Sequence, residues 1–262
     1  MWVIRDHDST VYLVGTVHAL RPEMLWSSKK ITQAVGESTE LWLELADPDN
    51  AAAAAPLMQK YGIDAGKPLS KKLNFDQKVK LAQVAEQYGL PIATLEPLKP
   101  WVVAVMLTVL QVQKAGYDPK AGVDHLLKAQ AEKEGDKVQG LETMEEQLSF
   151  FADISDRDQV AFLDQALEDA EEGVALLDRM AKAWSEGDND TLAEIFAAEM
   201  QKEAPELYKK LIVERNVRWS EQVEKILSGS GVHQVAVGAG HLVGPDRLQV
   251  QLAKRGIKAE PF

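Results

Sequence analysis

Near its end the chain contains Val235-Ala236-Val237-Gly238-Ala239-Gly240-His241, an apolar run that reaches a glycine and then a histidine. Near its start Val14-Gly15-Thr16-Val17-His18 repeats this pattern, and both copies read V-G-x-x-H-x-x-x-P followed by Asp or Glu. Continuous apolar residues without alternation are typical of strands that are buried on both faces of a parallel sheet. We therefore expect His18 and His241 just beyond the carboxyl ends of two strands, where open α/β sheets bind ligands.

Further short apolar runs alternate with helical patterns along the chain, which predicts an α/β fold. We expect a central, mainly parallel or mixed sheet flanked by helices, with a helical lobe inserted between the early and late strands. Three runs, Val11–Gly15, Leu41–Leu45 and Val232–Gly238, are expected at the centre of the sheet. The other predicted strands are Trp2–Arg5, Ile92–Leu95, Lys137–Leu141 and Ile257–Phe262.

The later middle of the chain is acidic and helical in pattern, since residues 131–230 contain 25 Asp and Glu against 11 Lys and Arg. Apolar residues at spacings of three and four from Val160 to Trp184 predict one amphipathic helix. A capping box of Thr191 and Glu194 predicts the start of the next helix, and a further helix is expected from about Pro205 to Leu227. We predict a single domain of residues 1–262, with an acidic helical lobe at about 143–230.

Composition excludes several classes of protein. With 262 residues, 45% of them hydrophobic and 27% charged, the chain should fold into a globular core. It has no cysteine, which excludes disulfides, thiolate metal sites and cysteine nucleophiles. A net charge of -12 argues against nucleic acid as a partner. The longest apolar run, Trp101–Leu110, is too short to predict a transmembrane segment.

Glu44 and Arg215 are charged residues in apolar surroundings. Glu44 interrupts the predicted strand Leu41–Leu45, and an unpaired buried carboxylate would be costly, so it needs a cation, a metal or a proton unless the strand lies at a solvent-exposed edge. Arg215 shares a helix face with Leu211 and Trp219. Its guanidinium should therefore meet either a buried carboxylate, such as Glu44 or Glu142, or a substrate oxyanion.

Three other acidic residues lie at positions that are compatible with two different roles. Glu142 and Glu96 each follow a predicted strand, and Asp124 follows Gly122. Each is either a site residue or an acid at the start of a helix. The remaining histidines, His7, His125 and His233, are expected to be structural.

These residues give the sequence a resemblance to the TraB/GumN family, which is related to the Tiki proteases and more distantly to erythromycin-esterase-like and ChaN-like proteins. The resemblance covers nearly the whole chain. It is carried by Tyr12-Leu13-Val14-Gly15-Thr16-Val17-His18, Leu43-Glu44-Leu45, Lys99-Pro100-Trp101, Gly122-Val123-Asp124, Gly140-Leu141-Glu142-Thr143, Glu214-Arg215-Asn216 and Val235–Leu242.

The resemblance implies that the paired GxxH motifs share one site with a glutamate that matches Glu44. It also implies metal-dependent hydrolysis, because the Tiki branch is described as divalent-metal proteases. An export signal is usual in such members, which implies a periplasmic or secreted protein, although this sequence opens directly on strand-like residues.

The leading hypothesis is a metal-dependent hydrolase, a peptidase by first preference, with a peptide or a small ester as its substrate. His18 and His241 would bind manganese, cobalt or zinc, with Glu44 as third ligand or general base. The other site residues would assist: Arg215 and Asn216 would steady the oxyanion, Glu142 would take part in catalysis, and Asp124, Gly15 and Gly238 would contact the substrate.

Two alternatives use the same residues. A metal-free, esterase-like hydrolase would use His18 as general base on a water molecule. A non-catalytic protein would hold a ligand, haem or metal in the same cleft, as the ChaN-like resemblance suggests. Metal content and turnover distinguish the three hypotheses.

Overall fold

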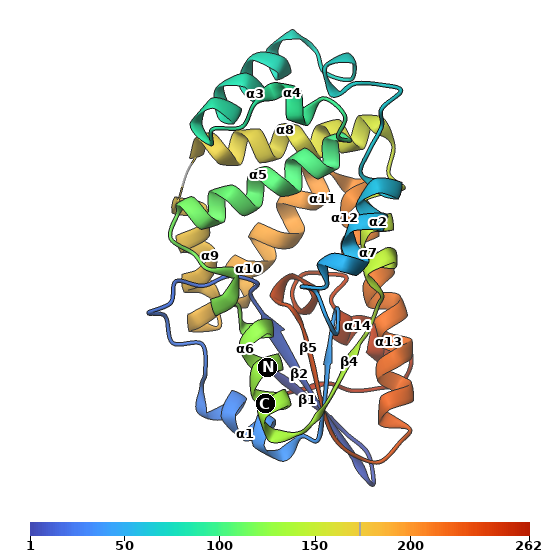
Figure 1. Cartoon of the computed structure of the whole chain (residues 1–262). Helices are drawn as coiled ribbons and strands as arrows, with labels where there is room; N and C mark the ends of the chain where they lie inside the picture. Colours follow the sequence, from blue (N-terminus) through green and yellow to red (C-terminus); the bar gives the residue numbers. More distant parts are fainter. Residues whose placement is uncertain (173) are drawn as a thin grey trace.

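The computed structural model describes residues 1–172 and 174–262, and its centre is a six-stranded mixed sheet (Figure 1). The order of the strands across the sheet is β4-β3-β5-β2-β1-β6. This confirms the predicted α/β fold and places all three expected central segments at the centre. The strands are β1 (Trp2–Arg5), β2 (Ser9–Thr16), β3 (Glu40–Leu43), β4 (Lys137–Gly140), β5 (Gly231–Gly238) and β6 (Glu260–Pro261).

Four neighbouring strands, β4, β3, β5 and β2, are parallel, whereas β1 and β6 complete one edge in antiparallel fashion. In the β2–β5 pair Thr16 lies opposite Gly238, and in the β3–β5 pair Leu43 lies opposite Ala236. The carboxyl ends of β2, β3 and β5 therefore meet at one edge of the sheet. Both GxxH motifs begin at that edge, and Glu44 lies there as the first residue after β3.

Helices cover both faces of the sheet. On one face Leu41, Leu43 and Ala236 pack with Val123 and Leu127 of helix α6 (Val123–Glu134). The other face packs against α13 (Glu214–Leu227) and α14 (Leu248–Lys254) in a second apolar cluster. That cluster includes Leu13, Val235, Val237, Trp219, Val223, Leu248 and Leu252, which are fully or almost fully buried.

A lobe of helices stands beyond the carboxyl edge of the sheet, at the top of Figure 1. It consists of α3 (Phe75–Gln87), α4 (Ile92–Leu95), α5 (Pro100–Lys114) and α8 (Asp156–Glu172), which share a separate apolar core. The lobe thus contains helices from residues 75–114 and from residues 156–172. Helix α13, which also belongs to the acidic stretch 131–230, packs on the sheet instead.

Shorter elements join these layers. The remaining α-helices are α1 (Lys29–Glu37), α2 (Ala51–Tyr61), α7 (Met144–Ala152), α9 (Ala175–Glu186), α10 (Asn189–Ala193), α11 (Glu199–Glu203) and α12 (Pro205–Tyr208). Three-residue or four-residue 3₁₀ turns occur at Leu69–Lys71, Pro119–Ala121 and Ala239–Leu242, and π-helical segments occur at Glu194–Ala198 and Lys209–Val213. No helix among residues 1–172 and 174–262 is long and apolar enough to cross a bilayer.

Several predicted elements were wrong in type or extent. Ile92–Leu95 is helix α4, because Pro91 lies at its N-cap and a four-residue apolar run fits a helix turn as well as a strand. The central strand ends at Leu43, so Glu44 follows β3 instead of lying within it. At the carboxyl terminus only Glu260–Pro261 forms a strand.

Two helix predictions also need correction. The helix expected at Thr191 begins at Asn189, because the Asp188 side chain accepts a hydrogen bond from the backbone N–H of Thr191. The stripe from Val160 to Trp184 belongs to two helices, α8 and α9, that run in different directions (Figure 1). Gly173, within that stripe, lies outside the described residues. The helix expected from Pro205 to Leu227 is confirmed as α12, the π-helical segment and α13.

Candidate active site

The two GxxH histidines meet at the backbone of Gly238. A methyl group placed on this glycine would lie 3.6 Å from His18 Nε2, 3.8 Å from His241 Cδ2 and 3.2 Å from Glu44 Oε1. The first two contacts come from the turns after β2 and β5, and the third from the residue after β3. Because Gly238 has no side chain, both imidazoles and one carboxylate can approach the same point beside its backbone.

Glu44 is held in its ionised form. Its Oε1 accepts a 2.8 Å hydrogen bond from the backbone N–H of Gly238, and its Oε2 accepts one of 2.5 Å from Arg215 Nη2. Burial favours the neutral acid, but the charges of Arg215 and His18 and the hydrogen bond from Gly238 outweigh it and keep the pKa of Glu44 well below its usual range. Glu44 was expected to need a cation, and the Arg215 guanidinium supplies it.

His18 is oriented by Asp124 on the first turn of α6. The two side chains are 3.3 Å apart between Nδ1 and Oδ1, which leaves Nε2 directed toward Gly238. The imidazole is two-thirds exposed by area and lines an open cleft. Desolvation in the cleft disfavours the charged form, but the charge of Asp124, 3.3 Å from the ring, prevails and raises the pKa of His18 to about 9.

Gly122 makes the contact between His18 and α6 possible. The backbone N–H of Val123 donates a 2.9 Å hydrogen bond to the carbonyl oxygen of Val17. A methyl group on Gly122 would lie only 2.7 Å from the carbonyl carbon of His18. The Gly122-Val123-Asp124 sequence thus brings a carboxylate to the first histidine by close backbone packing.

His241 is buried, and its tautomer follows from its neighbours. Its Nδ1 lies 2.9 Å from Asn216 Oδ1, while Asn216 Nδ2 donates to the carbonyl oxygens of His241 and Asp246. Since Asn216 Oδ1 must accept, Nδ1 of His241 carries the proton, and the lone pair of Nε2 accepts a 3.2 Å hydrogen bond from Arg215 Nη1. Burial and the nearby Arg215 cation lower the pKa of His241 to about 3, so this ring is neutral.

Arg215 is buried, with 6% of its surface exposed, and all of its donors are used. Its Nε and Nη2 donate to both carboxylate oxygens of Glu142, at 3.1 and 2.5 Å, and Nη2 also donates to Glu44. Its Nη1 lies 3.3 Å from the carbonyl oxygen of Leu211 and 3.2 Å from His241 Nε2. The guanidinium also stacks over Trp219, with its carbon 4.5 Å from the ring centroid.

This arrangement changes the roles expected of three residues. The five N–H groups of Arg215 and both N–H groups of Asn216 are engaged within the protein, so neither side chain offers a donor to a substrate oxyanion. Glu142 is buried against Arg215, and burial raises its pKa. The three residues instead position Glu44 and His241.

A cleft of about 290 Å³ opens beside this cluster. Sequence reasoning missed several residues of its wall, among them Thr16, Asp49, Lys128 and His125, which was expected to be structural. His125 Nε2 is 3.1 Å from Asp49 Oδ2. A helical signal was available for Lys128, because Asp124 and Lys128 are four residues apart and share a face of α6. The cleft is lined by Thr16, His18, Leu43, Glu44, Leu45, Pro48, Asp49, Pro119, Asp124, His125, Lys128, Gln147 and Ala236.

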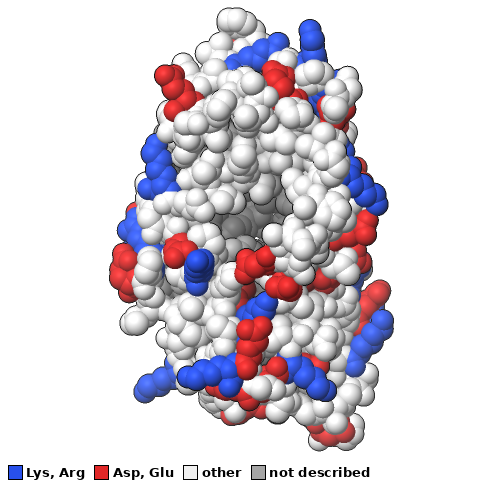
Figure 2. Space-filling model, viewed as in Figure 1, with Lys and Arg blue, Asp and Glu red and all other residues white. Residues whose placement is uncertain are grey.

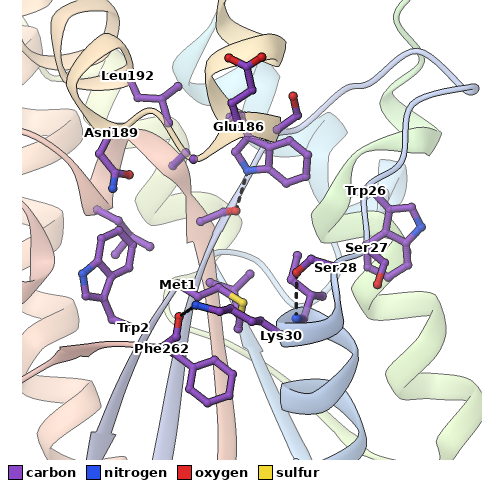
Figure 3. A pocket seen from close by; sticks show the side chains of 18 of the residues that line it. Met1, Trp2, Trp26, Ser27, Ser28, Lys30, Glu186, Asn189, Leu192 and Phe262 are labelled. Atoms are coloured by element: carbon purple, nitrogen blue, oxygen red, sulfur yellow. Dashed lines mark hydrogen bonds between the residues drawn. The ribbon is translucent and has the colours of Figure 1, made fainter.

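Figure 2 shows the face of the molecule that is hollowed between the helical lobe and the sheet, with several acidic side chains along the lower rim of the hollow. A second and larger cavity, of about 600 Å³, lies elsewhere, and Figure 3 shows Trp2 and Trp26 on opposite sides of it. Gly15, expected to contact the substrate, lines this cavity and not the histidine cleft. Its carbonyl oxygen accepts a 2.9 Å hydrogen bond from the Trp184 indole.

The residues expected to bind a metal fit one in their chemistry. His18 and His241 both lie beside Glu44 at Gly238, and each has its Nδ1 next to a side-chain oxygen, which is the usual orientation of metal-binding histidines. Their spacing is looser than that of a closed metal site. His241 Nε2 and Glu44 Oε1 are 3.9 Å apart, and Arg215 Nη1 lies against the same Nε2.

Among the described residues, only Asp6, His7 and Asp8 bring three metal-ligating atoms within 4.8 Å of one another, and all three residues are exposed. His18, His241 and Glu44 would therefore have to move closer together, and Arg215 Nη1 would have to release His241, before all three could hold one ion.

A sequence model of the TraB/PrgY/gumN family matches residues 1–261. Among curated proteins, the uncharacterized protein YbaP of Escherichia coli (strain K12) is 24% identical over 245 residues, which covers 92% of this chain and 87% of the relative. YbaP of Shigella flexneri matches to the same extent. An uncharacterized protein of Treponema pallidum (strain Nichols) is 21% identical over 267 residues, covering 97% of this chain and 80% of the relative. No solved structure matches the chain significantly.

Proposed function

This chain belongs to the TraB/PrgY/gumN family, and from that premise we propose that it is a metal-dependent hydrolase of peptide or small ester bonds. The observation that carries the proposal is the convergence of His18 Nε2, Glu44 Oε1 and the His241 ring on one point beside Gly238. Three independent strand ends supply these groups, and each group is fixed by a further partner. Such preorganised polar groups at one edge of an α/β sheet are typical of an active site.

In this proposal His18, His241 and Glu44 hold a manganese, cobalt or zinc ion. The ion would supply a water molecule of lowered pKa and polarise the scissile carbonyl. Asp124 and Asn216 keep both Nε2 atoms directed at the site, and Arg215 keeps Glu44 ionised. To bind the ion, His18 would have to release to solvent the proton that its raised pKa otherwise retains.

A metal-free hydrolase is the second candidate, and a specific observation favours it. The Arg215 guanidinium already lies against His241 Nε2 and Glu44, and thus supplies positive charge where an ion would sit. With a pKa of about 9, His18 would act at neutral pH as a proton donor to the carbonyl or leaving group instead of a base. Glu44 would then orient the attacking water.

The test combines metal analysis with turnover. Protein purified without chelator or metal-affinity resin is analysed for metal and then assayed on fluorogenic peptides and p-nitrophenyl esters, before and after chelation. We expect bound metal, and activity that chelation removes and manganese, cobalt or zinc restores. Glu44→Gln should lower turnover by about 100-fold or more, as loss of an activating group does.

The matched control is Glu96→Gln, which should leave turnover unchanged. Glu96 accepts a hydrogen bond from the Ser70 hydroxyl in the helical lobe, away from the cleft. Turnover that chelation leaves unchanged would favour the metal-free candidate. Bound metal without turnover of either substrate class would contradict both hydrolase proposals and favour a ligand-binding protein.

A further inference from the structure

The cleft needs a donor for the substrate carbonyl, because Arg215 and Asn216 have none to spare. In hydrolysis the carbonyl oxygen gains negative charge, and hydrogen-bond donors placed beforehand at that oxygen stabilise it. A hydroxyl group beside His18 and Glu44 that lacks a protein partner would be suited to this role.

Thr16 has such a hydroxyl. It is the last residue of β2, lies opposite Gly238 in the sheet and lines the cleft with His18 and Glu44. The residue is only 2% exposed, and its Oγ1 has no hydrogen-bond partner in the part of the chain that the structure describes. A buried hydroxyl without a partner lowers stability, so its presence at this position calls for a reason.

We infer that the Thr16 hydroxyl donates a hydrogen bond to the carbonyl oxygen of the bound substrate and to the oxyanion that forms from it. The inference rests on the proposed hydrolase function. Catalytic hydrogen bonds often form only when the substrate is present, which accounts for an unpaired Oγ1 in the free protein. The substrate then supplies the acceptor that the protein lacks.

The test compares Thr16→Val, which replaces the hydroxyl by a methyl group of similar shape, with Thr16→Ser, which retains the hydroxyl. Thr10→Val is the control, since it makes the same change in the same strand at the end far from the cleft. Thermal melting is the first measurement. Because the Thr16 hydroxyl has no partner in the folded protein, Thr16→Val should melt at or above the wild-type temperature.

Binding of benzylphosphonate, a tetrahedral oxyanion mimic, is the second measurement, made on metal-free protein by calorimetry. Wild type and Thr16→Ser should bind it, and Thr16→Val should bind at least about tenfold more weakly. In turnover assays Thr16→Val should lower kcat by about 100-fold, with a smaller change in KM, as removal of an oxyanion donor does.

A fall in melting temperature for Thr16→Val well beyond that of Thr10→Val would assign the hydroxyl a structural role and overturn the inference. Equal phosphonate affinity in wild type and Thr16→Val, or no binding by the wild type, would also overturn it. Phosphonate binding that depends on Thr16, without hydrolysis of any substrate, would support the contact and contradict the hydrolase function.

Discussion

Arg215 joins two carboxylates that would repel each other in a buried site. Replacing it by methionine keeps the apolar contact with Trp219 but leaves Glu44 and Glu142 without their cation. We expect Arg215→Met to lower the free energy of unfolding by about 3 to 5 kcal/mol, measured by urea denaturation. Arg218→Met is the control, because that side chain is 42% exposed and 3.8 Å from Glu142. It should cost less than about 1 kcal/mol, and an equally small loss for Arg215→Met would contradict the buried ion pair.

His18 should titrate far above an ordinary histidine. In metal-free protein the NMR signal of its ring should shift with a midpoint at about pH 9, and Asp124→Asn should bring that midpoint down. Because the folded pKa exceeds the unfolded value of 6.5, protonated His18 favours the folded state below pH 6.5, and this contribution is lost as the pH rises to about 9. Asp49→Asn, which removes the partner of His125, is the control and should leave the His18 midpoint unchanged. A midpoint near 6.5 in the wild type would show that Asp124 does not pair with His18.

At the scale of elements, the junction of α6 with the turn after β2 depends on the absence of a side chain at Gly122. We expect Gly122→Ala to destabilise the protein by about 1 to 3 kcal/mol, because the added methyl group meets the backbone of His18, which cannot move without shifting the sheet edge. In helix α1, Gly36 has nothing within 4 Å of an added methyl group. Gly36→Ala should therefore stabilise the protein by about 0.5 to 1 kcal/mol. Equal effects of the two variants in thermal melts would show that α6 is not held this closely.

At the scale of the whole molecule, a metal bound only to the folded protein must raise its stability. Manganese, cobalt or zinc at about a hundred times its dissociation constant should add roughly 2.7 kcal/mol to the free energy of unfolding. His18→Ala should abolish this gain. His7→Ala should preserve it, because His7 belongs to the exposed Asp6–Asp8 group on the turn between β1 and β2. Loss of the stabilisation in His7→Ala, with its retention in His18→Ala, would place the metal at that turn, away from the cleft.

The sequence alone determined the features that depend on local pattern. Short, mostly apolar runs predicted the central strands β2, β3 and β5, and the repeated V-G-x-x-H placed both histidines just past strand ends. Since parallel neighbours end at the same edge of a sheet, this was enough to expect His18 and His241 at one edge, whereas Glu44 was expected to join them only because the family resemblance implied it. A short run such as Ile92–Leu95 could not be assigned in this way, because four apolar residues satisfy a helix turn and a strand equally.

Only the tertiary structure decided what these residues touch. The position of Arg215 on a helix face was compatible both with substrate binding and with a buried ion pair. The packing of α13 against the sheet places its guanidinium between Glu44 and Glu142. The partner of His18 is Asp124, more than a hundred residues away, because α6 packs against the turn after β2. Charge pairing and pKa shifts depend on distances of a few ångströms between elements far apart in sequence. Residue type and spacing along the chain do not specify those distances.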